Sequence, residues 1–311
     1  MDRRRIIIFL AVAFGFTWSI DAVIWLTGGL ADSPELVAGL TLALPLLTVS
    51  MFGPAIAVFV TRWVTKEGWA NHRARFNGPV WPWVAMLFGP SVLAVVGTIG
   101  YFLVFPDQFD ASMPILAEQL AEAEEMTGEA VPIPAALLGI IQIAAAFTIA
   151  PLINAIPAFG EEFGWRGYLQ WKLRPLGWTK MLLATNVIWS VWHWPVIAMG
   201  HNYGFDYPGA PWTGFLAMTV FTLAVGAILG WSAERTGSAL PAALGHGAIN
   251  ATAAIGLLFL ATGAEPSSLL GPAAVGLLGG VGLTVVGVWL MFREPAGFEA
   301  EAEPVVVGEG S

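Results

Sequence analysis

Cysteine is absent from this sequence and charged residues are scarce. Without cysteine there is no disulfide, no thiolate zinc site and no cysteine nucleophile. Only 11% of the 311 residues are charged and 57% are hydrophobic, whereas soluble domains have roughly 25% charged and roughly 45–50% apolar residues. The net charge of −9 argues against a nucleic-acid partner. This composition indicates a membrane protein.

Long apolar runs recur along the chain. A transmembrane helix needs ~20 mostly apolar residues. Eight segments approximate this length: 6–27, 36–62, 81–105, 135–158, 181–200, 213–233, 239–261 and 270–292. We predict an all-α fold, a polytopic membrane bundle of about eight transmembrane helices that forms a single domain over residues 1–293. The first run resembles a signal peptide, but it is too long and lacks a small-residue cleavage site, so we expect it to stay as the first helix.

The basic residues predict an orientation, because Lys and Arg collect in cytoplasmic loops. With the N-terminus inside and eight crossings, the inner segments are 1–5, 63–80, 159–180, 234–238 and 293–311. Twelve of the 13 Lys and Arg residues fall in these segments, and Arg62 lies at the inner end of a helix. We therefore expect both termini in the cytoplasm.

Two segments outside the apolar runs are acidic. Residues 106–134, on the outer side, hold seven Asp and Glu residues. We expect a solvated loop there, with a short surface helix over 114–126 as the alternative. The tail 294–311 is rich in Glu, Gly, Pro and Val without a helical period, so we expect a disordered acidic cytoplasmic tail.

One of the four histidines lies inside the fifth apolar run, where an ionisable residue is costly and indicates function. Asn186, Ser190 and His193 recur at helical spacing, which predicts a polar stripe facing the bundle interior. His72 and His201 fall in loops, and we expect them to be ordinary loop residues.

A second histidine lies in the seventh apolar run. His246 and Asn250 are four residues apart and share one helix face. Gly245 and Gly247 flank the histidine and allow close approach of backbone or substrate. This face is therefore a second candidate for the site.

Two adjacent carboxylates, Glu161 and Glu162, stand in an apolar stretch. Glu162 and Arg166 are spaced to form an ion pair on a helix, which leaves Glu161 without a basic partner. An unpaired carboxylate in an apolar setting is suited to general acid or base catalysis near neutral pH. Taken singly, the ion pair is more often structural, Glu161 could be an interfacial carboxylate, and a membrane histidine could serve packing. Together these groups could hold a water, take its proton and stabilise an oxyanion.

In this order, the motifs resemble those of the CPBP family. They read Glu-Glu-x-x-x-Arg at 161–166, aromatic-x-x-x-His at 189–193 and His-x-x-x-Asn at 246–250. The family contains the type II CAAX prenyl endopeptidases and bacterial abortive-infection or bacteriocin-immunity membrane proteases. The motifs lie within roughly 150–255, which we take as the CAAX-protease-like catalytic core. Trp189 stands where Phe is usual, and eight helices match the family's architecture.

The resemblance implies an intramembrane endopeptidase of the glutamic type. Glu161 and His193 would activate the water, and His246 and Asn250 would bind the tetrahedral oxyanion. The supporting residues would be Glu162, Arg166 and Trp189. A water-filled cavity open to the cytoplasmic side would admit a peptide or membrane-protein substrate near the inner leaflet.

We expect no cofactor, with zinc as the alternative. A catalytic zinc needs three protein ligands plus water, which Glu161, His193 and His246 could supply. The metal-free interpretation is favoured because the helical zinc signature His-Glu-x-x-His is absent.

The expected partners are the substrate and the lipid bilayer, in a prokaryotic plasma membrane. The location rests on the resemblance and on the absence of an organelle-retrieval sequence at the end. One alternative is a non-catalytic immunity or scaffold protein of the same fold. A transporter with a proton relay is another, against which no inverted repeat is seen.

The predicted helix ends leave the site residues at different depths. At ~1.5 Å per residue, His193 lies ~20 Å and His246 ~10–14 Å from the inner face, whereas Glu161 lies near zero. Either Pro151 and Pro157 break the fourth helix so that Glu161 turns inward, or the predicted boundaries are wrong.

Overall fold

Helices make up almost all of the regular structure in the computed structural model, which describes residues 2–37, 39–129, 132–298 and 300. The α-helices are α1 (Arg3–Leu26), α2 (Ala43–Ser50), α3 (Gly53–Val64), α4 (Trp81–Val104), α5 (Pro114–Thr127), α6 (Ala135–Phe147), α7 (Ala150–Gly164), α8 (Gln170–Leu173), α9 (Trp178–Trp192), α10 (Trp194–Ala198), α11 (Trp212–Thr236), α12 (Leu240–Thr252) and α13 (Val281–Met291). The short 3-10 helices are η1 (Pro106–Gln108), η3 (Arg174–Leu176) and η4 (Ile255–Phe259), and η2 (Trp165–Leu169) is a π-helix. One antiparallel hairpin joins β1 (Glu35–Val37) to β2 (Leu40–Thr41).

Five helices in the described part of the chain are long and apolar enough to cross a membrane, or six if a bent pair counts as one span. They are α1, the α2–α3 stretch, α4, α11 and the α12–η4 stretch, with α6 and α7–η3 as the bent pair. A mostly helical architecture with several helices able to span a membrane is therefore confirmed. α9 has 15 residues and α13 has 11, fewer than the ~20 that a perpendicular crossing needs. A total of eight crossings stays a prediction.

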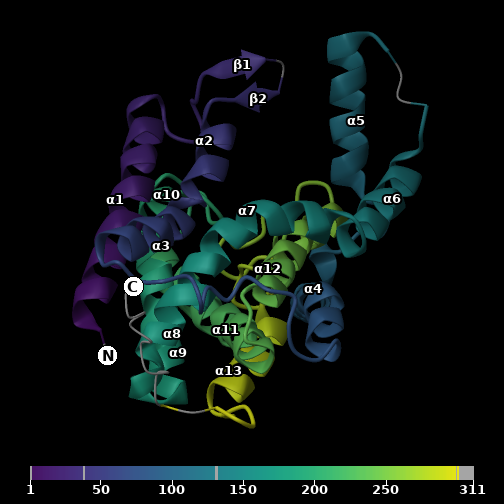
Figure 1. Ribbon diagram of the computed structural model, residues 1–311. Helices are drawn as coiled ribbons and strands as arrows, with labels where there is room; N and C mark the ends of the chain where they lie inside the picture. The colour runs from purple at the N-terminus through teal and green to yellow at the C-terminus, as the bar shows by residue number, and fades with distance from the viewer. Residues whose placement is uncertain (1, 38, 130–131, 299, 301–311) are drawn as a thin grey trace.

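Three predicted segments differ in detail from the corresponding elements of the structure. The second run begins as the β1–β2 hairpin, whose turn uses Gly39 at a φ of 75°. The eighth is helical only from Val281. The acidic outer segment forms helix α5 instead of the expected loop: Pro114 stands in its first turn, and Gly128, at a φ of 71°, ends it. Helix α5 stands beside α6 at the edge of the bundle (Figure 1).

The fourth run is bent, which explains the apparent mismatch in depth. Helices α6 and α7 meet at 48°, and Pro151 stands in the first turn of α7, where a missing N–H is tolerated. Pro157 lies inside α7 without ending it, and the helical path continues through η2 and α8 to Leu173. The predicted end at residue 158 is wrong, and Glu161 lies well inside a helical segment.

Close helix packing brings α7 against α12 and α3. A Cβ atom at Gly247 would lie 2.4 Å from the Pro151 carbonyl oxygen and 2.6 Å from the Ala155 nitrogen. A Cβ atom at Gly164 would lie 2.3 Å from Pro54. Small residues at such contacts let helix backbones approach in membranes, and here they draw the Glu161 and His246 helices together, as the crossing of α7 and α12 in Figure 1 shows.

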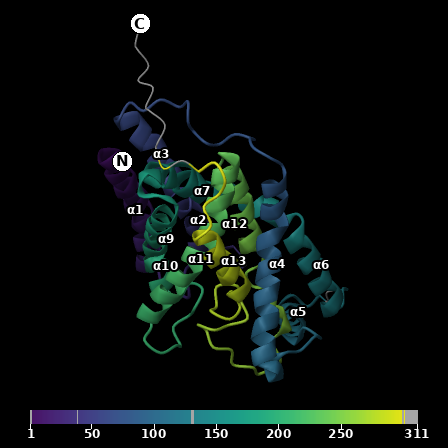
Figure 2. The same ribbon diagram turned by 90° about the horizontal axis from the view of Figure 1, so that it is seen from below.

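Ion pairs gather at the end of the bundle that holds the start of α1. Glu67 pairs with Arg5 at 3.3 Å and with Lys172 at 2.5 Å, and Arg174 pairs with Glu234 at 3.6 Å. We call this group the basic end. Figure 2 shows α1 and α3 side by side in this part of the molecule.

The structure differs from two predictions about the segments near the basic end. Arg166, which was placed in an inner loop, is 1% exposed inside the bundle because it pairs with Glu162. In the expected disordered tail, Phe298 packs against Trp178, with ring centroids 5.5 Å apart. Residues 299 and 301–311 of that tail lie outside the described residues.

Candidate active site

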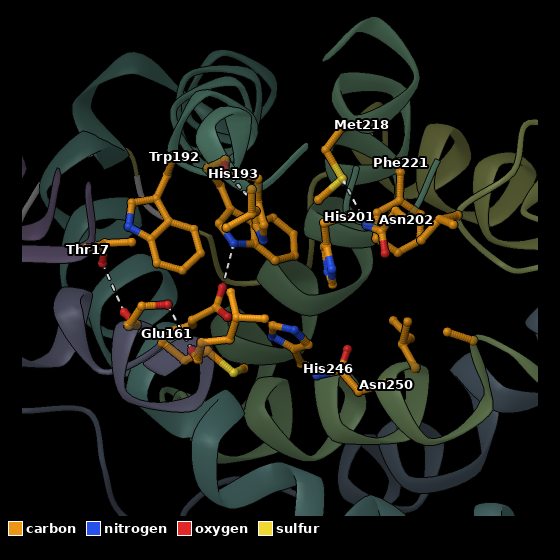
Figure 3. Close-up of a pocket in the computed structure, with 18 of the residues that line it drawn as sticks. Thr17, Glu161, Trp192, His193, His201, Asn202, Met218, Phe221, His246 and Asn250 are labelled. Carbon is orange, nitrogen blue, oxygen red and sulfur yellow. Dashed lines mark hydrogen bonds between the residues drawn. The ribbon is translucent and has the colours of Figure 1, made fainter. Parts of the chain in front are cut away.

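A cavity of about 340 Å³ lies between α1, α7, α9, α11 and α12. All four residues predicted to act in catalysis line it, together with residues that the sequence did not single out (Figure 3). Its lining consists of Thr17, Asp21, Leu47, Ser50, Met51, Glu161, Trp189, Trp192, His193, Val196, His201, Asn202, Met218, Phe221, His246, Ile249, Asn250, Ala253 and Val275. Residues more than 200 positions apart in the chain therefore share one chamber.

Glu161, from α7, is 2% exposed and is held by one hydrogen bond to α9. The Trp189 indole Nε1–H donates to its Oε2 atom over 2.8 Å. No salt bridge of Glu161 is found among the described residues, so the carboxylate is neutralised by neither Arg166 nor another cation in direct contact. The prediction that Glu161 lacks its own basic partner is confirmed.

Glu162 is fully buried and has two partners. Arg166 Nη1 donates to Glu162 Oε1 over 2.9 Å, which confirms the predicted i,i+4 pair. The same oxygen lies 2.9 Å from Nδ1 of His246. Arg166 also donates to Asn186 Oδ1 over 3.0 Å. The ion pair thus connects α7 to α9 and α12 and fixes the ring of His246.

His193 lies at the end of α9, where the chain turns into α10, and not inside a continuous helix as predicted. Its Nδ1 is 2.8 Å from the Trp189 carbonyl oxygen. A carbonyl can only accept, so Nδ1 carries the hydrogen and Nε2 keeps its lone pair. The predicted polar stripe faces inward: Asn186 and Ser190 are fully buried, and His193 lies on the cavity wall.

His246 and Asn250 present one face of α12 to the cavity, as predicted. His246 is 6% exposed, and its ring lies edge-on to Trp189 with centroids 5.5 Å apart. Because Nδ1 is bound to Glu162, only Nε2 is free for another partner. No hydrogen bond of the Asn250 side chain occurs among the described residues, so its amide is available as well.

The cavity also contains residues that sequence reasoning missed. Asp21 of α1 is 1% exposed, and neither of its carboxylate oxygens has a hydrogen-bond partner among the described residues. A single acidic residue inside the first apolar run was the available signal. His201, expected to be an ordinary loop residue, lies on the wall, as does Asn202 with a φ of 67°.

The cavity lies away from the basic end. Asp21 is near the far end of α1, whose start holds Arg5, and Asn250 is near the far end of α12. Helix α12 begins beside the basic end, because the Ala239 N–H donates to the Arg73 carbonyl. An opening on the cytoplasmic side, as expected from the sequence, would lie at the basic end. The residues that line the cavity lie away from that end.

The alternative zinc site depends on whether enough donor side chains lie close together. Three His, Asp or Glu side chains would have to converge within bonding distance of one ion. In the part of the chain that the structure describes, no group of three such residues is placed to hold a metal ion. The trio of Glu161, His193 and His246 shares the cavity without forming such a cluster.

Comparison with known proteins agrees with the motifs. Residues 130–252 match a family described as "Type II CAAX prenyl endopeptidase Rce1-like". No curated protein matches the chain. The matched segment contains α7, α9 and α12, and therefore all four predicted catalytic residues, whereas Asp21 lies outside it. The resemblance to CAAX-type membrane proteases is therefore confirmed over residues 130–252.

Proposed function

We propose that the protein is an intramembrane endopeptidase of the glutamic type, which cleaves a peptide bond of a membrane-proximal peptide or protein. The observation that carries the proposal is the shared cavity of Glu161, His193, His246 and Asn250. Two acceptors stand on one wall, from α7 and α9, and two potential donors stand on another, from α12. This separation suits a reaction in which a water is deprotonated and an oxyanion forms.

The first wall would activate the water. The Glu161 carboxylate accepts the proton of a water that His193 Nε2 orients through its lone pair. Trp189 fixes both groups, because its indole binds Glu161 and its carbonyl binds His193. A positioned general base of this kind contributes typically ~10²–10⁴-fold to the rate.

The second wall would stabilise the oxyanion. The Asn250 amide donates to it directly. His246 donates from Nε2 when its ring is an imidazolium, because Nδ1 already carries the hydrogen bound to Glu162. An oxyanion donor is worth ~10²–10³-fold in kcat.

The proposed reaction needs no proton acceptor or donor other than Glu161 and the attacking water. The water oxygen bonds to the scissile carbonyl carbon while its proton moves to Glu161, giving the tetrahedral oxyanion. The C–N bond then breaks as the Glu161 carboxylic acid returns that proton to the leaving nitrogen. The products are a carboxylic acid and an amine, and the Glu161 carboxylate is regenerated. No metal takes part in this scheme.

We further propose eight crossings with the basic end in the cytoplasm of a prokaryotic cell, with residues 1–293 forming one membrane domain. The distribution of Lys and Arg supports this orientation. With it, the cavity lies in the outer half of the membrane. The substrate would enter from the lipid or from the outer side, and not through the basic end.

The proposal is tested by comparing purified wild type with Glu161→Gln, His193→Ala and Asn250→Ala on a fluorogenic peptide library, with and without a chelator. We expect at least ~10²-fold lower kcat/KM for each variant and no effect of the chelator. Glu234→Gln is the matched control, because Glu234 is a buried carboxylate that binds Gln170 and Arg174 away from the cavity. Near-normal cleavage by folded Glu161→Gln would overturn the mechanism, and loss on chelation with rescue by zinc would favour the metal alternative. If wild type cleaves nothing in the library while it stays folded, the immunity or scaffold interpretation gains equal standing.

A further inference from the structure

Of the two carboxylates that line the cavity, Asp21 is the one with neither an ion pair nor a hydrogen bond in the described protein. It is 1% exposed, and both carboxylate oxygens lack a hydrogen-bond partner. It takes part in no ion pair among the described residues, unlike Glu162 and Glu67. Burying a carboxylate without a partner is costly, so a group entering the cavity is the remaining source of a partner.

The side chain is held in place by the packing of α1. One turn before it, Thr17 donates to the Ser50 carbonyl over 2.9 Å, and Trp18 donates to the Trp192 carbonyl over 3.1 Å. One turn after it, Ile24 is fully buried in a cluster with Val196. These contacts fix the rotation of the helix and direct Asp21 at the cavity that Glu161 also lines.

Arg166, which is buried inside the bundle, already has other partners. Arg166 is bound to Glu162 and to Asn186 and does not line the cavity. Arg5 and Lys172 form ion pairs at the basic end, near the other end of α1. A counter-ion for Asp21 would therefore have to come from a ligand.

Apolar side chains form part of the cavity wall that Asp21 shares. Leu47, Met51, Val196, Met218 and Phe221 line the same chamber. A lysine or arginine side chain combines an aliphatic stem with a cationic head. Such a side chain would lie along the apolar wall and place its charge on Asp21.

Resting on the proposed function, we infer that Asp21 forms a subsite that binds a Lys or Arg side chain of the substrate peptide. Glu161 and Asp21 then have different tasks in one cavity: the first accepts a proton from water, and the second selects a cationic residue near the scissile bond. The subsite lies outside the segment 130–252 that matches the protease family.

The test measures binding separately from catalysis. Dansyl-labelled apolar peptides with Lys placed at each position in turn are titrated against full-length Glu161→Gln protein in detergent. Each is compared with the same peptide carrying norleucine, which keeps the stem and removes the ammonium. We expect at least one Lys peptide to bind about tenfold tighter or more than its norleucine partner. This ratio should fall to near one in Glu161→Gln/Asp21→Asn and persist in Glu161→Gln/Glu234→Gln.

Equal affinity of every Lys and norleucine pair would overturn the subsite, and so would a Lys preference that Asp21→Asn leaves unchanged. A folding check separates a structural role: removing an unpaired buried carboxylate should leave the thermal stability unchanged or raise it. The experiment distinguishes failure of the subsite from failure of the protease proposal on which it rests. Cleavage by wild type without Lys preference would refute only the subsite, and Lys-dependent binding without cleavage would count only against the endopeptidase.

Discussion

A single residue, Trp189, connects the two groups that would activate water. Trp189 donates from its ring to Glu161 and accepts from His193 through its carbonyl. The sequence marked this position only as an aromatic residue where the resembled family has Phe. A phenyl ring has no N–H, so this chain contains a hydrogen bond to the Glu161 carboxylate that a Phe at this position could not make.

We predict that Trp189→Phe lowers kcat/KM about 10–100-fold without unfolding the protein, since a hydrogen bond to a charged group contributes ~1.5–3 kcal/mol. Trp192→Phe is the matched control. Trp192 also lines the cavity, but its Nε1 has no partner among the described residues. Steady-state kinetics on one peptide measures both variants, and equal effects of the two substitutions would contradict the role given to the Trp189 indole.

Site residues differ in how far sequence could predict them. Local spacing predicted the Glu162–Arg166 pair, because i,i+4 geometry is fixed by the helix. The contact between Glu162 and His246 joins residues 84 positions apart, and no local rule predicts it. Asp21 was predictable as an intramembrane acid, but its place in this cavity depends on how α1 packs against α2 and α10.

At the scale of elements, long uninterrupted apolar runs were predicted well and broken ones poorly. The run 81–105 matches α4, Trp81–Val104, almost residue for residue. In contrast, the bend between α6 and α7 was predicted only as one of two alternatives, from Pro151 and Pro157, and the π-helix η2 and the non-helical stretch before α13 were not predicted. Hydropathy reports burial in lipid or protein and does not report where the backbone bends.

The approach of α7 and α12 gives a test at this scale. Gly247→Ala would place a Cβ atom 2.4 Å from the Pro151 carbonyl oxygen, so the helices must separate and His246 must shift with them. We expect a loss of stability of ~1–3 kcal/mol together with at least tenfold lower activity. Gly89→Ala is the control, since nothing lies within 4 Å of its added Cβ atom.

Thermal unfolding and peptide cleavage would be measured on the same preparations of both glycine variants. Gly89→Ala should be neutral or slightly stabilising, because alanine favours a helix over glycine. If Gly247→Ala behaved like Gly89→Ala, the close contact between α7 and α12 would not determine the site.

For the whole molecule, the ion pairs of the basic end predict a pH dependence of stability. Burial alone would raise the pKa of Glu67, but the hydrogen bond and charge of Lys172, with the Tyr168 hydroxyl and Arg62, outweigh it and lower the pKa. A lowered folded-state pKa means that Glu67 contributes stability above the usual Glu pKa of ~4.3. This contribution is lost as the pH falls through the folded-state value.

We expect Glu67→Gln to lower the melting temperature at pH 7, with a difference from wild type that shrinks as the pH is lowered below ~4.3. Melting curves of the two proteins in detergent between pH 7 and pH 3 measure this. A difference that stayed constant over the range would show that the Glu67 charge contributes nothing to stability.

The orientation of the whole bundle can be measured because the chain has no cysteine of its own. We predict that Lys66→Cys, at the basic end, reacts with a membrane-impermeant thiol reagent only in inverted vesicles. Asp206→Cys, in the loop after α10, should react in intact cells. Both residues are exposed, and the reverse pattern would place the cavity in the inner half of the membrane.

The wall that α1 gives to the cavity has a consequence for biosynthesis. Asp21 is made before most of the residues that line the cavity, and Asn250, which also lines it, follows 229 residues later (250 − 21). At ~5–20 residues per second, that interval is on the order of 10–50 s. During this interval, the newly made helix α1 carries the Asp21 carboxylate before the cavity that later encloses it has formed. We therefore expect the insertion of α1 to be less favourable than its hydrophobicity alone suggests, because an acidic residue inside a membrane helix is costly.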